Sequence, residues 1–299
     1  MNIEKSNPSY IIGAILVLIS AIGFSAKAVL VKLAYVYQVD ATTLLFLRMV
    51  FATPFFLGVG IYKMRSEKTK LSKIEWLYVA LLGFLGYYLS SILDFLGLVY
   101  ISAGMERLIL FIYPTIVVVL SAFIFKHKVN QREIISLGIT YIGIVIVFIS
   151  DKVEKTENIF LGAFLIFLCA FTYSAYLMGS GKMIPRIGAS RFTAYAMLVA
   201  CISIILHFSI THKVEDLKLP LEVYSLSFGM AIISTVMPTF LLAQGIKRVG
   251  SGPASIIGTI GPVSTILLAW IFLGETLNLF QLFGTGLVIV GVFIVSYKR

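Results

Sequence analysis

Charged residues are scarce in this sequence. Asp, Glu, Lys and Arg make up 13% of the 299 residues, whereas hydrophobic residues make up 59%. A soluble domain typically contains about 25% charged residues. Only part of a globular chain lies in its core, so a soluble protein of this length could not bury so much apolar surface. The composition therefore excludes a soluble domain and indicates an integral membrane protein.

Cysteines, histidines and catalytic motifs are also few. Both cysteines, Cys169 and Cys201, lie in apolar runs, which argues against a disulfide framework, and the three histidines have no metal-ligand spacing. The chain has no Walker A motif, no dinucleotide-binding fingerprint, no GxSxG and no HExxH. A primary ATP-driven pump is therefore excluded, and we expect no catalytic residue, metal or cofactor.

Long apolar runs account for most of the sequence. A helix needs about 20 residues to cross the hydrocarbon core of a bilayer. The runs predict an all-α integral membrane protein with ten transmembrane helices. The expected spans are residues 10–33, 43–62, 74–97, 103–125, 133–150, 158–178, 191–210, 221–246, 252–273 and 280–297. The first run is too long for the apolar region of a signal peptide, so we interpret it as the first span.

The basic residues orient these spans. The net charge of +10 lies mostly in short loops, so it sets topology rather than forming a nucleic-acid-binding patch. With a cytoplasmic N-terminus, sixteen of the 24 Lys and Arg residues fall on the cytoplasmic side. The outer loops contain only Lys152, Lys155, Lys213 and Lys218. This asymmetry predicts a multi-pass protein of the cell (inner) membrane with both termini in the cytoplasm.

The two halves of the chain resemble each other. Residues 100–149 align without gaps on residues 248–297, which pairs Gly104 with Gly252, Pro114 with Pro262, Asn130 with Asn278, Gly138 with Gly286 and Gly143 with Gly291. Near the starts of the halves, Gly13-Ala14 aligns with Gly162-Ala163 and Ser25-Ala26 with Ser174-Ala175. We predict two five-helix repeats, residues 1–150 and 151–299. Because five is odd, the copies are inverted, which is typical of secondary transporters with a substrate site between the repeats.

Several short motifs resemble those of a known family. Tyr100-Ile-Ser-Ala-Gly104 leads to Pro114, and Leu273-Gly-Glu-Thr276 is followed by Gln281, Gly284 and Gly291. Together they resemble the ten-helix EamA-type branch of the drug/metabolite transporter superfamily, over almost the whole chain. The resemblance implies a carrier for small metabolites, often amino acids, with a central cavity between the halves.

One feature departs from the short multidrug relatives in that superfamily. Those dimeric proteins bind cations and protons at a glutamate in their first helix, whereas the first helix here contains Lys27 and Lys32 and no carboxylate. This disfavours an antiporter of cationic drugs and protons.

Among the charged residues of the predicted spans, five are candidate site residues, and all five belong to the first repeat and to the outer half of the membrane. They are Lys27, Arg48, Asp94, Glu106 and Arg107. Charges at this depth are costly, by about 2.5–3.5 kcal/mol each. They either line an outward-opening cavity and bind a charged substrate, or form an ion-pair network that only holds helices together. Their formal sum of +1 favours an anionic or zwitterionic substrate.

Tyrosines and prolines complete the set of candidate site residues. Tyr87, Tyr113, Tyr173 and Tyr176 lie well within spans, where a hydroxyl needs a partner that either a cavity or ordinary helix packing provides. Pro114 and Pro262 occupy equivalent positions in the fourth and ninth spans. Each should bend its helix, as a gating hinge or as a static kink.

These features predict a monomeric secondary transporter. We expect it to move a small polar metabolite, such as an amino acid, outward through a cavity between the repeats by alternating access. The alternatives are an integral-membrane enzyme or a channel-like protein that uses the outer charged cluster. The expected partners are a small-molecule substrate and the lipid bilayer, without nucleic acid.

Overall fold

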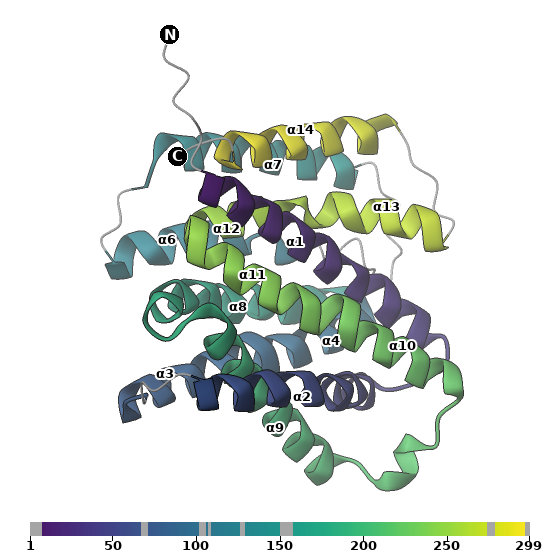
Figure 1. Ribbon diagram of the computed structural model, residues 1–299. Coiled ribbons are helices and arrows are strands. Elements are labelled where there is room, and N and C mark those ends of the chain that lie inside the picture. Colours follow the sequence, from purple (N-terminus) through teal and green to yellow (C-terminus); the bar gives the residue numbers. More distant parts are fainter. Residues whose placement is uncertain are drawn as a thin grey trace.

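The computed structural model describes residues 8–66, 71–101, 106, 109–125, 129–149, 158–273 and 279–296, and within these ranges all regular structure is helical (Figure 1). The first half contains α1 (Pro8–Tyr35), α2 (Ala41–Ser66), α3 (Lys73–Gly83), η1 (Phe84–Leu89), α4 (Ser90–Tyr100), α6 (Tyr113–Phe125) and α7 (Gln131–Ile149). The second half contains α8 (Ile159–Ile187), α9 (Ala189–Thr211), η2 (Val214–Leu217), α10 (Leu221–Ala231), η3 (Ile232–Val236), α11 (Met237–Val249), α12 (Ser251–Ile257), η4 (Gly258–Ile260), α13 (Gly261–Leu273) and α14 (Leu279–Ser296).

Helices occupy all ten predicted spans. Within the described ranges, seven helical stretches are long and apolar enough to cross a membrane. Shorter apolar helices at Tyr113–Ile124 and Leu282–Gly291 lie in the predicted fourth and tenth spans. Large apolar side chains such as Phe123, Phe160 and Ile210 point outward, as expected of a surface solvated by lipid. The prediction of an all-α integral membrane protein is confirmed.

Most helix ends lie within a few residues of the prediction, and α8 is the exception. α8 continues to Ile187 rather than ending at residue 178. The eighth and ninth spans are separated by a single residue, Gly250, whose φ of 87° lies in the left-handed region that favours glycine. The predicted boundary between the repeats, at residues 150 and 151, lies outside the described residues and stays a prediction.

The two halves interlock with a two-fold pattern. α1 packs against α11 and α13 of the other half, and its counterpart α8 packs against α4 and α6. The pairs α2 with α9 and α7 with α14 each join equivalent helices, and Figure 1 shows α7 and α14 side by side at one edge of the bundle. Most of the packing therefore lies between the halves rather than within them.

Glycines allow the closest of these crossings. A Cβ atom on Gly13 would lie 3.4 Å from the Gly245 carbonyl oxygen, and one on Gly162 would lie 3.2 Å from that of Gly97. The two crossings are equivalent, because Gly13 aligns with Gly162 and Gly97 aligns with Gly245 when the halves are superimposed in sequence. Lipid provides no hydrophobic drive for the association of helices, so membrane helices associate largely through close packing. Small residues at such crossings allow the helices to approach closely enough for it.

Irregular segments also recur at equivalent places. The gap-free alignment of the halves, continued toward the N-terminus, pairs Phe84, where the π-helix η1 begins, with Ile232, where the π-helix η3 begins. It also pairs the first residue of α6, Tyr113, with the first residue of α13, Gly261. Insertions of this kind are frequent at functional sites, and both π-helices face the interface between the halves.

Pro114 and Pro262 each occupy the second position of a helix. The chain turns at residues 111 and 112 before α6, and the 3-10 helix η4 precedes α13. The interruption in the ninth span is a short 3-10 turn within one helical stretch, Ser251–Phe272, whereas the one before α6 is a turn at residues 111 and 112. We call these two interruptions of the α-helix breaks. Proline has no N–H to donate to the carbonyl four residues back, so the first turn of a helix accommodates it without a lost bond.

Candidate functional site

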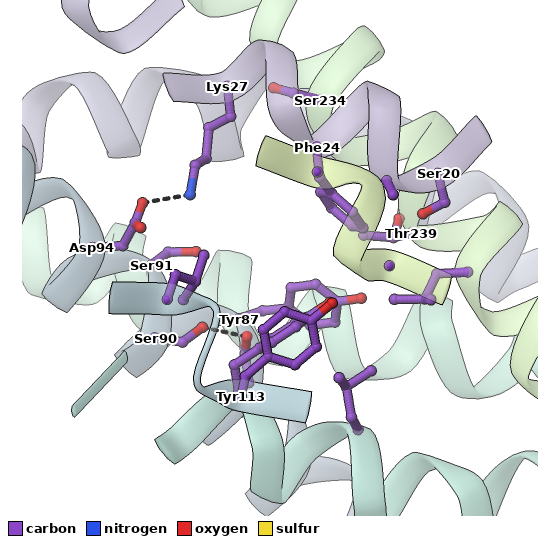
Figure 2. A pocket seen from close by; sticks show the side chains of 18 of the residues that line it. Ser20, Phe24, Lys27, Tyr87, Ser90, Ser91, Asp94, Tyr113, Ser234 and Thr239 are labelled. Atoms are coloured by element: carbon purple, nitrogen blue, oxygen red, sulfur yellow. Dashed lines mark hydrogen bonds and ion pairs between the residues drawn. The ribbon is translucent and has the colours of Figure 1, made fainter. Parts of the chain in front are cut away.

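A cavity of about 120 Å³ lies between the halves (Figure 2). Its walls come from α1, α2, η1, α4 and α6 of the first half, and from α8, η3, α11, α12, η4 and α13 of the second. A buried water needs roughly 10–15 Å³ on this measure, so the cavity can accommodate several waters or a small solute. Hydroxyl groups from both halves line it, among them those of Ser20, Ser90, Ser91, Ser234 and Thr239.

Lys27 bridges two buried carboxylates beside this cavity. Its Nζ lies 2.5 Å from Asp94 Oδ2 and 3.7 Å from Glu106 Oε1. The side chain of Lys27 is 14% exposed, whereas those of Asp94 and Glu106 are 1% and 0% exposed. Figure 2 shows Lys27 reaching from its helix toward Asp94 across the cavity wall. A pair this short and this buried ties α1 to α4, as the alternative of a structural ion pair requires.

Arg48 is buried in a different way. It is only 4% exposed and lines the cavity, yet no Asp or Glu among the described residues forms a salt bridge with it. Its Nη2 donates to Ser91 Oγ at 3.0 Å, and its Cζ lies 4.9 Å from the centre of the Phe95 ring. Its Nε has no hydrogen-bond partner among the described residues. The described groups that this guanidinium contacts are therefore neutral, although it brings a full positive charge to the cavity wall.

Tyrosines connect the two halves around the cavity. The hydroxyls of Tyr87 and Tyr176 hydrogen-bond each other at 3.0 Å, and Tyr113 donates to the Ser255 carbonyl oxygen at 3.0 Å. Tyr173 packs edge-on against Tyr113, with ring centres 5.5 Å apart. Each contact joins a residue of one half to a residue of the other, so these rings form part of the seam through which the halves meet.

The structure brings most of the predicted site residues together. Lys27, Arg48, Tyr87, Asp94, Tyr113 and Tyr173 line the cavity. Glu106 and Tyr176 lie behind this wall, against Lys27 and Tyr87 respectively. Pro114 and Pro262 follow cavity-lining residues at the two breaks, and Arg107 lies outside the described residues.

Sequence reasoning missed the hydroxyl groups of the cavity. A helical stripe could have revealed them, because residues three or four apart share one face of a helix. Ser20, Phe24 and Lys27 follow this spacing on α1, as do Tyr87, Ser90 or Ser91, and Asp94 along η1 and α4.

Known proteins match this chain over almost its full length. An EamA-like transporter family model matches residues 11–149 and again residues 160–297. The uncharacterized transporter YcbK of Bacillus subtilis is 31% identical over 288 residues, which cover 95% of this chain and 91% of YcbK. The uncharacterized transporter YyaM of the same organism is 26% identical, and the match covers 83% of this chain and 82% of YyaM.

A solved crystal structure has the same fold. It superposes with a TM-score of 0.74 and 15% sequence identity, and the match covers 95% of this chain and 96% of the other. The twofold match of the family model follows the internal similarity of the two halves. With helices in all the predicted spans and a cavity between the halves, this chain belongs to the EamA-like transporter family and is a membrane transporter rather than an enzyme.

Proposed function

We propose that this protein is a monomeric secondary transporter that exports a small polar metabolite with an acid group, such as an amino acid. The cavity between the halves is its substrate site, and alternating access exposes this cavity to each side of the membrane in turn.

The observation that supports this proposal is the charge of Arg48. A guanidinium inside a membrane protein is costly unless an anion balances it. The described groups that contact Arg48 directly are a serine hydroxyl and a phenyl ring. The Asp94 carboxylate acts on Arg48 electrostatically, but its salt bridge is with Lys27. A substrate carboxylate would provide the counter-charge. The planar guanidinium suits it because two N–H groups can bind both oxygens of a carboxylate. Lys27, by contrast, already pairs with Asp94.

The neighbouring side chains suit the rest of a small zwitterion. The hydroxyls of Ser90, Ser234 and Thr239 can accept hydrogen bonds from an ammonium group. Tyr87 and Tyr173 also line the cavity, and aromatic rings attract cations. The cavity volume limits the substrate to a small metabolite.

Purified protein in proteoliposomes should show saturable counterflow of its substrate. The vesicles are loaded with each of the twenty L-amino acids singly, and uptake of the same labelled amino acid is measured against an outward gradient. A carrier takes up label faster into loaded vesicles, because unlabelled substrate that leaves the vesicle brings the binding site back to the outer side. Flux that rises linearly with concentration would instead indicate a channel, and absence of flux for every amino acid would remove that substrate class.

We further propose that the protein lies in the cell membrane with both termini in the cytoplasm. A green fluorescent protein fused after Arg299 should fluoresce, because it folds in the cytoplasm, and alkaline phosphatase fused there should be inactive. Phosphatase fused after Lys213, in the connection between α9 and α10, should be active and serves as the matched control. An active phosphatase at Arg299 would contradict the count of ten spans.

A further inference from the structure

Two buried serines, one in each half, hydrogen-bond the backbone at the two helix breaks. Ser25 on α1 donates to the Gly261 carbonyl oxygen at 2.9 Å, and Ser174 on α8 donates to the Tyr113 carbonyl oxygen at 3.1 Å. The alignment of the halves pairs Ser25 with Ser174, and it also pairs Gly261 with Tyr113. The structure thus contains the same contact twice, and we name each one a serine clasp.

Each clasp holds the first residue of the helix that follows a break. Gly261 begins α13 and Tyr113 begins α6, and a proline comes directly after each of them. Figure 1 shows that α6 and α13 run from their breaks toward opposite ends of the bundle. Since the fourth and ninth spans cross the membrane in opposite directions, the clasps fasten helices that lead to opposite membrane faces.

Each clasp can open without stranding a polar group. Ser25 Oγ also lies 2.8 Å from the Ala21 carbonyl oxygen, and Ser174 Oγ lies 2.6 Å from that of Ala170. A hydroxyl has one hydrogen to donate, so it can bind either its own helix or the neighbouring break. If the break moves away, the hydroxyl keeps an acceptor four residues back, and the large penalty for a buried unsatisfied donor does not arise.

The clasped segments also form part of the cavity wall. Tyr113, Gly258 and Gly261 line the cavity, and Tyr113 donates to the carbonyl oxygen of Ser255 in α12, the helix that precedes the opposite break. A solute in the cavity therefore lies against both breaks at once.

We propose that Ser25 and Ser174 are positioning residues for transport, and that each serine clasp keeps one end of the transporter closed. Release of Ser174 from Tyr113 frees α6 and opens the cavity toward the face where α6 ends. Release of Ser25 from Gly261 frees α13 and opens it toward the other face. This inference rests on the alternating access of the proposed function, but it requires no particular substrate.

The test measures on which side the cavity is accessible. Native Cys169 lines the cavity and serves as the reporter, in full-length protein with Cys201→Ala, reconstituted in sealed vesicles. A membrane-impermeant maleimide is applied to either side, and the ratio of labelling from the α6 face to labelling from the α13 face is recorded. We expect Ser174→Ala to raise this ratio at least threefold and Ser25→Ala to lower it.

Ser174→Ala should have the larger effect. The Gly261 carbonyl oxygen also accepts a hydrogen bond from Thr265 Oγ1 at 3.1 Å, whereas the residue equivalent to Thr265 is Val117, which has no hydroxyl. The matched control is Ser180→Ala on α8, because Ser180 donates to the Leu177 carbonyl oxygen of its own helix. This variant should leave the ratio unchanged.

The outcomes separate the two proposals. If the wild type is labelled from only one face, alternating access fails, and the clasp proposal fails with it. The clasp proposal alone is overturned if the wild type is labelled from both faces but the two serine variants do not act in opposite directions. That is the case when Ser25→Ala and Ser174→Ala change the labelling ratio in the same direction, or change it no more than Ser180→Ala does. Should the serine variants not fold, Thr265→Val removes the hydroxyl that shares the Gly261 carbonyl oxygen with Ser25. The Ser25 clasp should then hold more tightly and labelling from the α13 face should slow, and an unchanged rate would also overturn the clasp.

Discussion

Lys27→Met should destabilise the protein by about 3–5 kcal/mol, the typical cost of removing one partner of a buried ion pair. The substitution leaves Asp94 without the ammonium that lies 2.5 Å away and removes a cation 3.7 Å from Glu106. A low-dielectric interior cannot solvate these carboxylates, so their charge would either be neutralised by protons or disrupt the packing of α1 against α4. The thermal midpoint in detergent should fall by several degrees, with little correctly folded protein recovered.

Two companion variants make this expectation specific. Lys27→Met with Asp94→Asn removes both members of the pair and should recover most of the lost stability, because no unpaired carboxylate remains at position 94. Lys32→Met removes a second lysine of α1, which donates to the Leu98 carbonyl oxygen at 2.9 Å, and should cost much less. If the Lys27→Met protein melts like wild type, the Lys27–Asp94 ion pair does not stabilise the fold. Lys27 would then again be a candidate for substrate binding.

Arg48→Met should weaken substrate binding strongly while leaving the fold intact. An apolar side chain of similar length replaces a buried cation that forms no salt bridge with a described carboxylate. Asp94 acts on Arg48 electrostatically but keeps its ion pair with Lys27, so stability should change little. A substrate carboxylate that loses a buried charged partner loses about 2–5 kcal/mol of binding free energy. The Kd should therefore rise about 30-fold or more, since 1.4 kcal/mol corresponds to a factor of ten.

Melting temperature and ligand-induced shift, measured together, test this expectation. The ligands are the twenty L-amino acids, each at a fixed concentration, and the shift seen with wild type should vanish in Arg48→Met. Arg191→Met is the matched control: Arg191 is buried like Arg48, with its Cζ 5.7 Å from the centre of the Tyr195 ring, but it does not line the cavity. A ligand shift that survives in Arg48→Met, or disappears equally in Arg191→Met, would refute the assignment of Arg48 to the substrate site.

The sequence was sufficient to predict the ten spans, because lipid requires helices of about 20 apolar residues and permits few charges within them. It also predicted that Lys27, Arg48 and Asp94 lie at similar depth. It could not show which cation pairs with Asp94. That depends on how each helix is rotated about its axis, and the rotation of α1 is fixed by contacts such as Gly13 against Gly245, which belongs to the other half of the chain.

The position of Tyr176 shows a second limit. A regular helix through residues 84–89 would turn Tyr87 differently, but the π-helix η1 inserts an extra residue and changes the register. Tyr87 then faces the cavity, and Tyr176 packs so closely on Gly86 that a Cβ there would clash with its ring. Apolar periodicity predicts a helix in this region but does not reveal such an insertion. Similarly, the prolines suggested bends but did not reveal the turn before α6 or the 3-10 helix before α13.

The interlocked halves also constrain how the chain assembles during synthesis. At about 5–20 residues per second, Gly245 is made roughly 10–45 s after Gly13, so α1 must wait in the bilayer before α11 exists to pack on it. The ion-pair partner of Lys27 arrives sooner, because Asp94 is only 67 residues downstream. During most of the wait the lysine can therefore be neutralised from within its own half. An early salt bridge inside a late-closing bundle lets a charged first helix remain in lipid until the second half completes the fold.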